Sequence, residues 1–509
     1  MTECKRVTDK TRKIVILGGG TAGWITANAL IRSWSNKGVE ITLIESPTIG
    51  TVGVGEGSTP LLKLFFDSIG VQESEWMPRC NATYKNGISF ANWTSRPGFD
   101  RYFHPFASQL DQHTITAFYF NTYARRQGID VHAHPDRFFL AARLSENRQC
   151  PRPNENFPFV VEYGYHFDAN LVGEFLKEKA VAEGVTHVAA KVVEVDQASN
   201  GDINSLLTDN GSRIEGDFFI DCSGFRAALL QEALDVPFRP YAENLFNDAA
   251  VVLPTKQDDN IGSQTVSTAL QHGWAWEIPL TERIGNGYVY SSSFCSPDDA
   301  ETELRAHLGL LNSDTEARHL RMKVGRVEKH WHRNCLAVGL SQGFIEPLEA
   351  TALNLVCNTV NNFMAFVEKD QGLSGRSRDA FNQRVNRDFE LVRDYIVAHY
   401  VLNSRGDTDY WSENTQNRNL SDRLQQILQI WTSGKNLSEE IERQQIPTSY
   451  TARSWYCLLS GYGYYPDLRQ GQNNEPVAQR IDMSEIDEFV RRCALNFRSQ
   501  NEQLQFQAG

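Results

Sequence analysis

A glycine-rich turn between a strand and a helix is the feature that most constrains the fold of this chain. Lys13 to Leu17 is a short β-branched run that ends at Gly18, and Thr21 to Ser33 follows with apolar residues at helical spacing. A second apolar run, Ile41 to Ile44, ends at Glu45. Strand, helix and strand in this order form a βαβ unit whose strands lie parallel in a buried sheet, so we predict an α/β fold.

The turn matches the pattern GxGxxG of a Rossmann-like dinucleotide-binding module. Gly18 permits the tight turn, Gly20 lets the backbone approach a pyrophosphate, and Gly23 lets helix and strand pack closely. The helix N-terminus faces the negative charge of the phosphates. The predicted cofactor contacts are therefore Gly18, Gly20, Thr21, Ala22 and Gly23, with Glu45 accepting hydrogen bonds from ribose hydroxyls.

The pattern alone does not distinguish FAD from NAD. Two later segments favour FAD, because a long bent cofactor needs support beyond the first turn. One is the glycine-rich stretch 53–60, which contains Val54 and Gly55, and the other is the stretch 334–355, which contains Leu340. We therefore expect a flavin module of the monooxygenase type.

Charge and cysteine usage exclude several classes of partner. The 63 acidic and 50 basic residues give a net charge of -13, which repels nucleic acids and anionic lipid surfaces. The first residues are polar and basic, so we expect a cytoplasmic protein without a membrane anchor. The nine cysteines are scattered and form no CxxC pair, which indicates reduced thiols and no metal site.

The chain is predicted to divide near residue 376. Residues 1–376 form a discontinuous FAD-binding module with inserted, aromatic-rich substrate segments, and residues 377–509 form a mainly helical cap that contributes to the substrate site. The helical periodicity predicts helices over Arg384 to Val401, Ser421 to Trp431 and Ser484 to Phe497.

A short aromatic motif makes the interpretation more specific. His272 to Leu280 contains WxWxIP, and other segments of the same kind lie in order along the chain: GGGTAGW at 18–24, VGVGEGSTP at 52–60, TYKNGISFANW at 83–93, YHFDA at 165–169, FIDCSGFR at 219–226, GYVYSS at 287–292 and GFIEPLEAT at 343–351. The chain therefore resembles the flavin-dependent tryptophan halogenase family over most of its length.

The resemblance implies an activity and its cosubstrates. Members of this family use FADH2, O2 and a halide (chloride, bromide or iodide) to form hypohalous acid, which halogenates an electron-rich aromatic compound such as an indole. The chain shows no nicotinamide-binding module, so we expect a separate NAD(P)H-dependent flavin reductase to supply FADH2. Whether the chain forms a homodimer stays open.

Two catalytic residues follow from the same resemblance. Lys85, in an extended segment from Thr83 to Trp93, aligns with the family's essential lysine, which either hydrogen-bonds the hypohalous acid or forms a haloamine. Glu349 aligns with the catalytic carboxylate, which positions the acid and accepts the proton that the ring loses. The neighbouring Glu346 is the weaker candidate for the base.

Further roles are expected for residues around this pair. Trp274 and Trp276 lie at alternate positions of an extended segment and would form a wall between flavin and substrate. Backbone amides at Thr351 and Ala352 begin a helix and would bind the halide. Ala350 stands where the family commonly has serine, so one hydroxyl near the carboxylate is missing.

The substrate end departs from the tryptophan-specific members. His104 and Phe106 resemble the residues that bracket the aromatic substrate, and Trp455 lies in a late substrate segment. The tyrosine pair and glutamate that hold free tryptophan are not evident, and Arg453 has the opposite charge. We therefore expect an indole, a phenol or a larger aromatic scaffold, with an acidic group facing Arg453 as one option.

Two alternatives remain. A flavin monooxygenase shares the nucleotide fold, but it carries a late aspartate for the ribityl chain, where this sequence has Gly339, Leu340 and Ser341. A catalytically silent flavoprotein would have no need of Lys85 and Glu349. A halide-dependent product distinguishes the halogenase from both.

Overall fold

A six-stranded sheet forms the centre of the cofactor half of the molecule. The computed structural model describes residues 12–50, 55–154, 156–373, 376–446, 450–468 and 481–508. The strand order is β22-β23-β13-β1-β2-β9, parallel except for the pair β22/β23. Its strands are β1 (Arg12–Leu17), β2 (Val39–Glu45), β9 (Thr186–Ala189), β13 (Phe218–Asp221), β22 (Trp331–His332) and β23 (Cys335–Ala337). The predicted α/β fold is confirmed.

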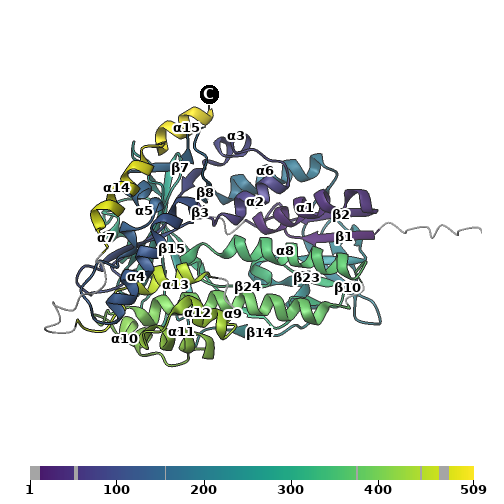
Figure 1. Ribbon diagram of the computed structural model, residues 1–509. Helices are drawn as coiled ribbons and strands as arrows, with labels where there is room; N and C mark the ends of the chain where they lie inside the picture. The colour runs from purple at the N-terminus through teal and green to yellow at the C-terminus, as the bar shows by residue number, and fades with distance from the viewer. Residues whose placement is uncertain are drawn as a thin grey trace, which may run out of the picture.

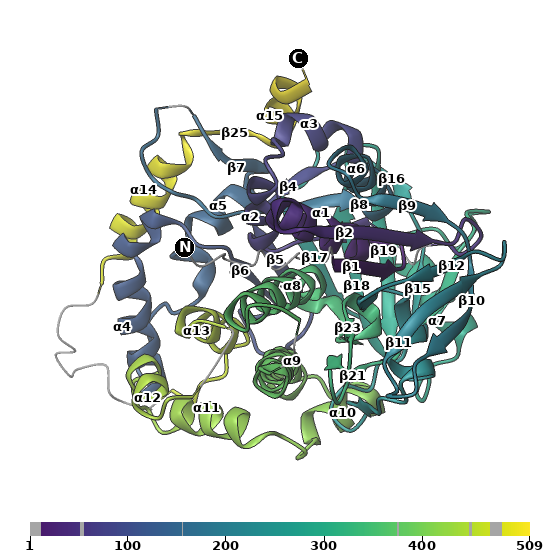
Figure 2. The same cartoon turned by 90° about the vertical axis from the view of Figure 1, so that its right-hand side faces the viewer.

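Helices cover this sheet because its inner strands are apolar on both faces. Ile14 and Ile16 of β1 pack into one core cluster and Val15 and Leu17 into another. Helix α1 (Thr21–Trp34) packs against α6 (Ala169–Ala182) and α8 (Ala352–Lys369). Figure 1 shows α8 running beside α9 (Arg378–Leu402), and Figure 2 shows α9 nearly end-on with α8 tilted above it.

A larger and mainly antiparallel sheet lies in the other half. Its order is β20-β15-β19-β18-β17-β5-β6, with β16 paired to β19 and only β17/β5 parallel. The strands are β5 (Gly87–Ala91), β6 (Arg101–Pro105), β15 (Ala249–Val252), β16 (Thr255–Lys256), β17 (Thr265–Ala269), β18 (Gly273–Pro279), β19 (Arg283–Tyr290) and β20 (Arg318–Arg321). This sheet carries the aromatic segments that the sequence assigns to the substrate side.

Small sheets connect the two halves. Strand β8 (Gly164–Asp168) lies between β3 (Gly55–Gly57) and β4 (Thr83–Lys85). The other small sheets are built from β10 (Val192–Gln197), β11 (Ile203–Thr208) and β12 (Arg213–Glu215), from β14 (Phe238–Pro240), β21 (Gly325–Val327) and β24 (Gly343–Phe344), and from β7 (Gln149–Pro153) and β25 (Phe497–Ser499).

The segment predicted to be one extended stretch from Thr83 to Trp93 is in fact two strands. Strand β4 pairs with β8, whereas β5 belongs to the larger sheet. Asn86 lies between them and is tied down by its amide, which donates to the Gln149 carbonyl and the Ser263 hydroxyl at 2.9 Å. The change of sheet places Lys85 at the junction of the two halves.

The C-terminal region is largely helical, as predicted, but its end returns to the first half. Helices α9 and α11 (Asp422–Thr432) match the predicted ones closely. The prediction of a helix through Phe497 was wrong at its end, because α14 (Met483–Ala494) stops earlier and Phe497 pairs with Pro153 in β25/β7. The division at residue 376 stays a prediction.

The remaining helices surround the two sheets. They are α2 (Leu61–Ser68), α3 (Glu73–Trp76), α4 (Ile115–Arg126), α5 (Leu140–Glu146), α7 (Pro297–His307), α10 (Asp409–Gln416), α12 (Leu437–Arg443), α13 (Ala452–Gly461) and α15 (Gln500–Ala508). Figure 1 shows α10 to α13 gathered at one end of α9. Within the described residues, no helix has the length and apolar character needed to cross a membrane.

Candidate active site

The glycine-rich turn has the close contacts that its motif requires. Gly18 has a φ of +115°, and a Cβ there would lie 2.1 Å from the Cys222 carbonyl oxygen. A Cβ at Gly23 would lie 2.0 Å from the Gly18 oxygen, so helix α1 can approach the strand only without a side chain. A Cβ at Gly20 would meet no atom within 4 Å. The backbone at Gly20 is therefore accessible to a pyrophosphate at the start of a 14-residue helix.

The other predicted cofactor residues lie around this turn. The Glu45 carboxylate lies beside Gly19 and accepts from Lys177 Nζ at 3.3 Å and His187 Nε2 at 3.1 Å. The Thr21 hydroxyl donates to the Ala169 carbonyl at 3.3 Å. A Cβ at Gly339 would lie 2.7 Å from Ala22 Cβ, so the turn that contains Leu340 adjoins the start of α1.

The second glycine-rich stretch leads from the cofactor side toward Lys85. Val54 lies outside the described residues, and Gly55 begins β3, which pairs with β8. A Cβ placed on Gly57 would lie 3.0 Å from Lys85 Nζ. The glycine turn, which has no atom within 4 Å of a Cβ at Gly20, would hold an extended dinucleotide such as FAD.

Lys85 is a completely buried amine. Among the described residues its Nζ has no hydrogen-bond partner, and it lies 5.7 Å from the centre of the Phe106 ring. Burial lowers the pKa of Lys85 to about 7, although the nearby charge of Glu349 opposes the decrease. An amine with this pKa changes protonation state near neutral pH, which suits a group that must hold and exchange protons.

Glu349 is close enough to Lys85 for its charge to raise the pKa of the lysine. His104 Nδ1 lies 3.1 Å from both oxygens of the Glu349 carboxylate, and His399 Nε2 lies 2.9 Å from Oε1. Burial would raise the pKa of Glu349, but the two histidines outweigh it and lower the pKa to about 2. The carboxylate therefore stays ionised inside the protein.

One extended segment brings the two predicted catalytic residues together. His104 lies in β6 and contacts Glu349, while Phe106 follows that strand and faces Lys85. Residues two apart in an extended chain point to the same side. The Phe106 amide donates to the Asn86 carbonyl at 3.0 Å, which fixes this segment against the residue after Lys85.

His399 is a site residue that sequence reasoning missed. It is fully buried in α9, and its Nδ1 lies 2.9 Å from the Tyr462 hydroxyl. Because Nε2 faces an ionised carboxylate it carries the proton, so Nδ1 accepts from Tyr462. Burial lowers the pKa of His399, although the hydrogen bond that its ring donates to Glu349 opposes the decrease. The only local feature of the sequence that could have indicated a site residue here is a histidine within the apolar stretch 395–402.

Glu346 faces a different set of groups. It is fully buried and accepts from the Trp274 indole nitrogen and the Asn247 amide, both at 2.9 Å, and from the Tyr400 hydroxyl. Burial raises the pKa of Glu346, and these three donors only partly offset the increase. Glu346 therefore holds the tryptophan wall and does not contact the histidines of Glu349.

The two tryptophans lie at alternate positions of β18, as the sequence predicts. Their ring centres are 6.2 Å apart and both side chains are buried. A Cβ at Gly287 on the neighbouring strand would lie 2.2 Å from the Trp276 ring, so that glycine makes room for the indole. The pair forms a continuous apolar surface anchored through Trp274.

The predicted halide site has the elements of an anion site. Helix α8 has 18 residues and begins at Ala352, after Thr351. Within the described residues, the buried Thr351 hydroxyl has no hydrogen-bond partner. Ala350 adopts a left-handed conformation with a φ of +55° and has no hydroxyl of its own. Amides and the Thr351 hydroxyl could therefore bind a halide beside Glu349.

At the substrate end an aromatic cluster lies behind His104. Tyr395 is 6.0 Å from the His104 ring, and Trp455 packs edge-on against Tyr395 at 4.8 Å. Tyr450 stacks on Tyr395 at 3.5 Å. Trp455 is only 1 % exposed, so it belongs to the packed part of this aromatic cluster.

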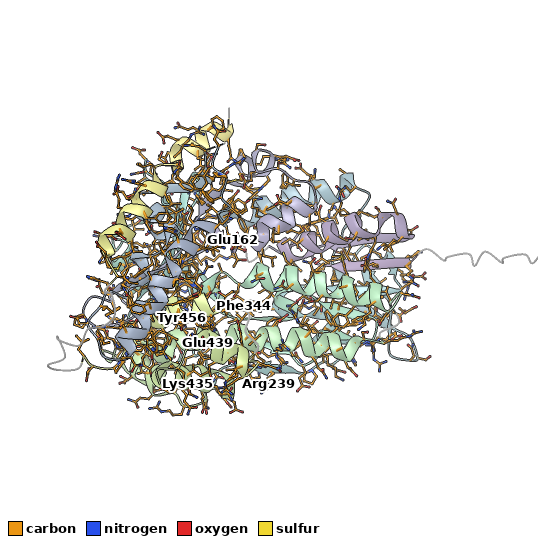
Figure 3. The ribbon with its side chains drawn as sticks, viewed as in Figure 1. Glu162, Arg239, Phe344, Lys435, Glu439 and Tyr456 are labelled. Carbon is orange, nitrogen blue, oxygen red and sulfur yellow. The ribbon has the colours of Figure 1, made fainter. Side chains whose placement is uncertain are left out.

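Arg453 lies in acidic surroundings. It lines a surface pocket of about 470 Å³ together with Asp111 and Glu162, and its guanidinium is 3.7 Å from the buried Asp111 carboxylate. Figure 3 shows Glu162 near the middle of the molecule. Tyr456, which belongs to the same helix as Arg453, lies toward the end where α10 to α13 gather. The option of an acidic substrate group facing Arg453 loses support, because a carboxylate already occupies that side.

Comparisons with known proteins agree with this arrangement. The family model described as Tryptophan halogenase matches residues 13–476. The tryptophan 6-halogenase SttH of Streptomyces toxytricini is 36% identical over 89% of this chain and 88% of its own, and the tryptophan 7-halogenase RebH of Lentzea aerocolonigenes is 33% identical over 91% of both.

Solved structures give the same result. The SttH crystal structure covers 97% of this chain and 99% of its own with a TM-score of 0.84 at 33% identity. BrvH, a flavin-dependent halogenase from Brevundimonas sp. BAL3, covers 98% of this chain and 100% of its own with a TM-score of 0.84 at 30% identity. The chain therefore belongs to the tryptophan halogenase family and is a flavin-dependent halogenase.

Proposed function

We propose that this enzyme uses FADH2, O2 and a halide to generate hypohalous acid and transfers the halogen to an electron-rich aromatic carbon. The observation that carries the proposal is the placement of Lys85 and Glu349 against His104 and Phe106 of one extended segment. Reduced FAD, when bound at the glycine turn, supplies the reduction of O2 that converts halide to hypohalous acid. A separate flavin reductase provides the FADH2.

The buried pair has complementary tasks in the transfer. The Lys85 ammonium donates a hydrogen bond to the oxygen of hypohalous acid, which makes the halogen more electrophilic. The aromatic carbon attacks the halogen, the halogen–oxygen bond breaks, and the oxygen leaves as water with a proton from Lys85. Glu349, which stays ionised, accepts the proton that the halogenated ring releases. Hypohalous acid and arene thus give haloarene and water, and the cycle closes when the proton that Glu349 accepted is returned to Lys85.

The aromatic neighbours select the substrate. His104 lies beside Glu349 and Phe106 beside Lys85, and the Tyr395 ring, which packs against Trp455, lies 6.0 Å from the His104 ring. Aromatic surfaces orient a planar ring without adding charge. SttH and RebH are named for tryptophan, but this chain has Arg453, paired with Asp111, in the late segment where the tyrosine pair and glutamate of the tryptophan-specific members are not evident. We therefore propose an indole or phenol held by shape, without a free amino-acid group.

Product analysis with a lysine variant tests the proposal. Indoles, phenols and free tryptophan are incubated with FAD, NADH, O2, a flavin reductase and bromide, and the products are examined by mass spectrometry. The unchanged enzyme should give bromine isotope doublets, and Lys85→Ala should give none. Lys63→Ala is the matched control, because Lys63 is a partly exposed lysine paired with Asp67 and should leave the product unchanged.

Other results would contradict specific parts of the proposal. An oxygenated product formed without bromide would indicate a monooxygenase. Equal bromination by Lys85→Ala would remove the lysine from the mechanism. Rapid NADH oxidation without the reductase would contradict the need for a separate partner, and preferential turnover of free tryptophan would contradict the proposed substrate class.

A further inference from the structure

Three side chains of types that bind metals meet near the start of β18, the strand that carries Trp274 and Trp276. His272 lies in the turn between β17 and β18, Cys295 follows β19, and Glu303 lies in α7. One ligand atom of each lies within 4.8 Å of the others. We propose that His272, Cys295 and Glu303 form a binding site for one divalent transition-metal ion of the zinc class, separate from the halogenation site.

The His272 ring has a nitrogen that the fold does not satisfy. Its Nδ1 is buried and has no hydrogen-bond partner among the described residues. The nearest carboxylate oxygen, Glu303 Oε2, is 3.8 Å away, which is too far for a hydrogen bond. A buried polar atom without a partner costs free energy, and coordination of a cation would use its lone pair.

Cys295 offers a thiol in an anionic environment. It is 7 % exposed, and its Sγ makes only a long contact of 3.5 Å with the Ser296 carbonyl. Burial, followed by the charges of Glu303 and Asp299, raises the pKa of Cys295 to about 11. A dication between these groups would neutralise the carboxylates and convert the thiol to the thiolate that binds metals, with release of a proton.

Glu303 is held in place by two donors. The Tyr288 hydroxyl donates to Oε2 at 2.9 Å, and the backbone amide of Gln271 donates to Oε1 at 2.6 Å. The His272 amide in turn donates to the Tyr288 oxygen at 2.9 Å, so one short network links two of the proposed ligands. Hydrogen bonds of this kind orient the ligands of known metal sites.

The donor set distinguishes among cations. Thiolate, imidazole and carboxylate together favour Zn²⁺ or Co²⁺ over Mg²⁺ and Ca²⁺, which prefer oxygen alone. Tetrahedral coordination places ligand atoms about 3.6 Å apart, so the three side chains would close by roughly 1 Å. Three protein ligands leave the fourth position for water.

The proposed ion would fix the turn that precedes the wall. His272 is two residues before Trp274, and the turn is already tied to α10 through Trp411 Nε1, which donates to the Leu270 carbonyl at 2.7 Å. Binding should therefore reduce amide hydrogen exchange in the stretch 270–276 and raise the Tm of the full chain.

Cobalt titration of the metal-stripped, reduced full-length protein tests the site. Co²⁺ should bind with one ion per chain and give a thiolate-to-cobalt charge-transfer band, which Zn²⁺ should displace. Cys295→Ser should abolish the band, and Glu303→Gln or His272→Asn should weaken Co²⁺ binding by about 10- to 100-fold. The matched controls are Cys493→Ser and His319→Asn, a thiol and an imidazole outside the cluster.

Several outcomes would overturn the proposal. No charge-transfer band at saturating Co²⁺ would show that the thiol binds no metal. A band that survives Cys295→Ser, or that either control variant removes, would place the ion elsewhere. Circular dichroism and Tm without metal identify a misfolded variant, and His272→Asn then decides the question, because that ring is one-quarter exposed and its replacement is tolerated most easily.

Discussion

Glu346 and Glu349 lie on either side of Pro347, and their surroundings shift their pKa values in opposite directions. Glu346 and Glu349 are three residues apart and both are buried, yet burial raises the pKa of Glu346 while the histidines lower that of Glu349 to about 2. The donors explain the difference. Glu346 accepts from an indole, an amide and a phenol, whereas Glu349 accepts from two imidazoles.

The comparison shows that burial alone does not give a carboxylate its role. A carboxylate among neutral donors anchors its neighbours, here the first tryptophan of the wall. A carboxylate between imidazoles stays charged and can stabilise a cation, and the charge of Glu349 does raise the pKa of Lys85 against the effect of burial. The predictions below separate the anchoring glutamate from the catalytic one.

The largest expected effect is on turnover. Glu349→Gln removes the charge and the proton acceptor, so kcat/KM should fall by about 10²- to 10⁴-fold. Glu346→Gln keeps a carbonyl acceptor for Trp274 and Asn247, so kcat/KM should stay within about tenfold of the unchanged enzyme. Steady-state bromination measures both, with FAD affinity as the check on folding. Equal losses in the two variants would contradict the division of roles.

A second prediction concerns the donor that the sequence did not reveal. His399→Phe removes the Nε2 donor to Glu349, so the carboxylate loses one of its two fixed contacts. Misplacement of a catalytic group by about 1 Å can cost about 10²-fold in rate, and we expect kcat to fall toward this value. His399→Gln, which can donate from its amide, should recover part of the loss. A purely structural role for His399 would instead lower Tm without recovery of kcat by glutamine.

The pH dependence gives a third test. The ammonium form of Lys85 is the hydrogen-bond donor, so activity should be retained below the Lys85 pKa of about 7 and fall as the pH rises through it. Glu349 raises this pKa, so Glu349→Gln should move the descending limb of the residual activity to lower pH. Glu346 does not contribute to the pKa of Lys85, and Glu346→Gln should leave the limb in place. A limb that moves in both variants would contradict the assignment.

Much of the cofactor half can be predicted from sequence because its signals are local. The βαβ unit lies within residues 12–45, and the GxGxxG spacing fixes which backbone positions lack side chains. The family resemblance further indicates Lys85, Glu349 and the two tryptophans, which the structure shows as buried residues, and their catalytic roles stay predictions. The break at Asn86 was missed although Asn86 and Gly87 form a dipeptide that is common in turns. Pairing of the two parts with different strands shows where the segment divides.

The substrate half is less predictable because its contacts join distant segments. His399 meets Glu349 from 50 residues away, and its place in the apolar stretch 395–402 does not indicate which carboxylate it contacts. Arg453 suggests an acidic ligand until Asp111, from another part of the chain, is found beside it. His272, Cys295 and Glu303 have no metal-binding spacing in sequence and meet only through the β18–β19 hairpin and α7.

The smallest expected effect concerns Tyr462, which contacts Glu349 only through His399. Its hydroxyl at His399 Nδ1 keeps the ring proton on Nε2, where it faces the carboxylate. Tyr462→Phe leaves the histidine in place but removes this constraint, so kcat should fall by about three- to tenfold, the equivalent of one hydrogen bond. His399→Phe combined with Tyr462→Phe should be no slower than His399→Phe alone, because the tyrosine then has no ring to orient. The double variant is measured by steady-state bromination, and additive losses would show that Tyr462 acts on the site by another route.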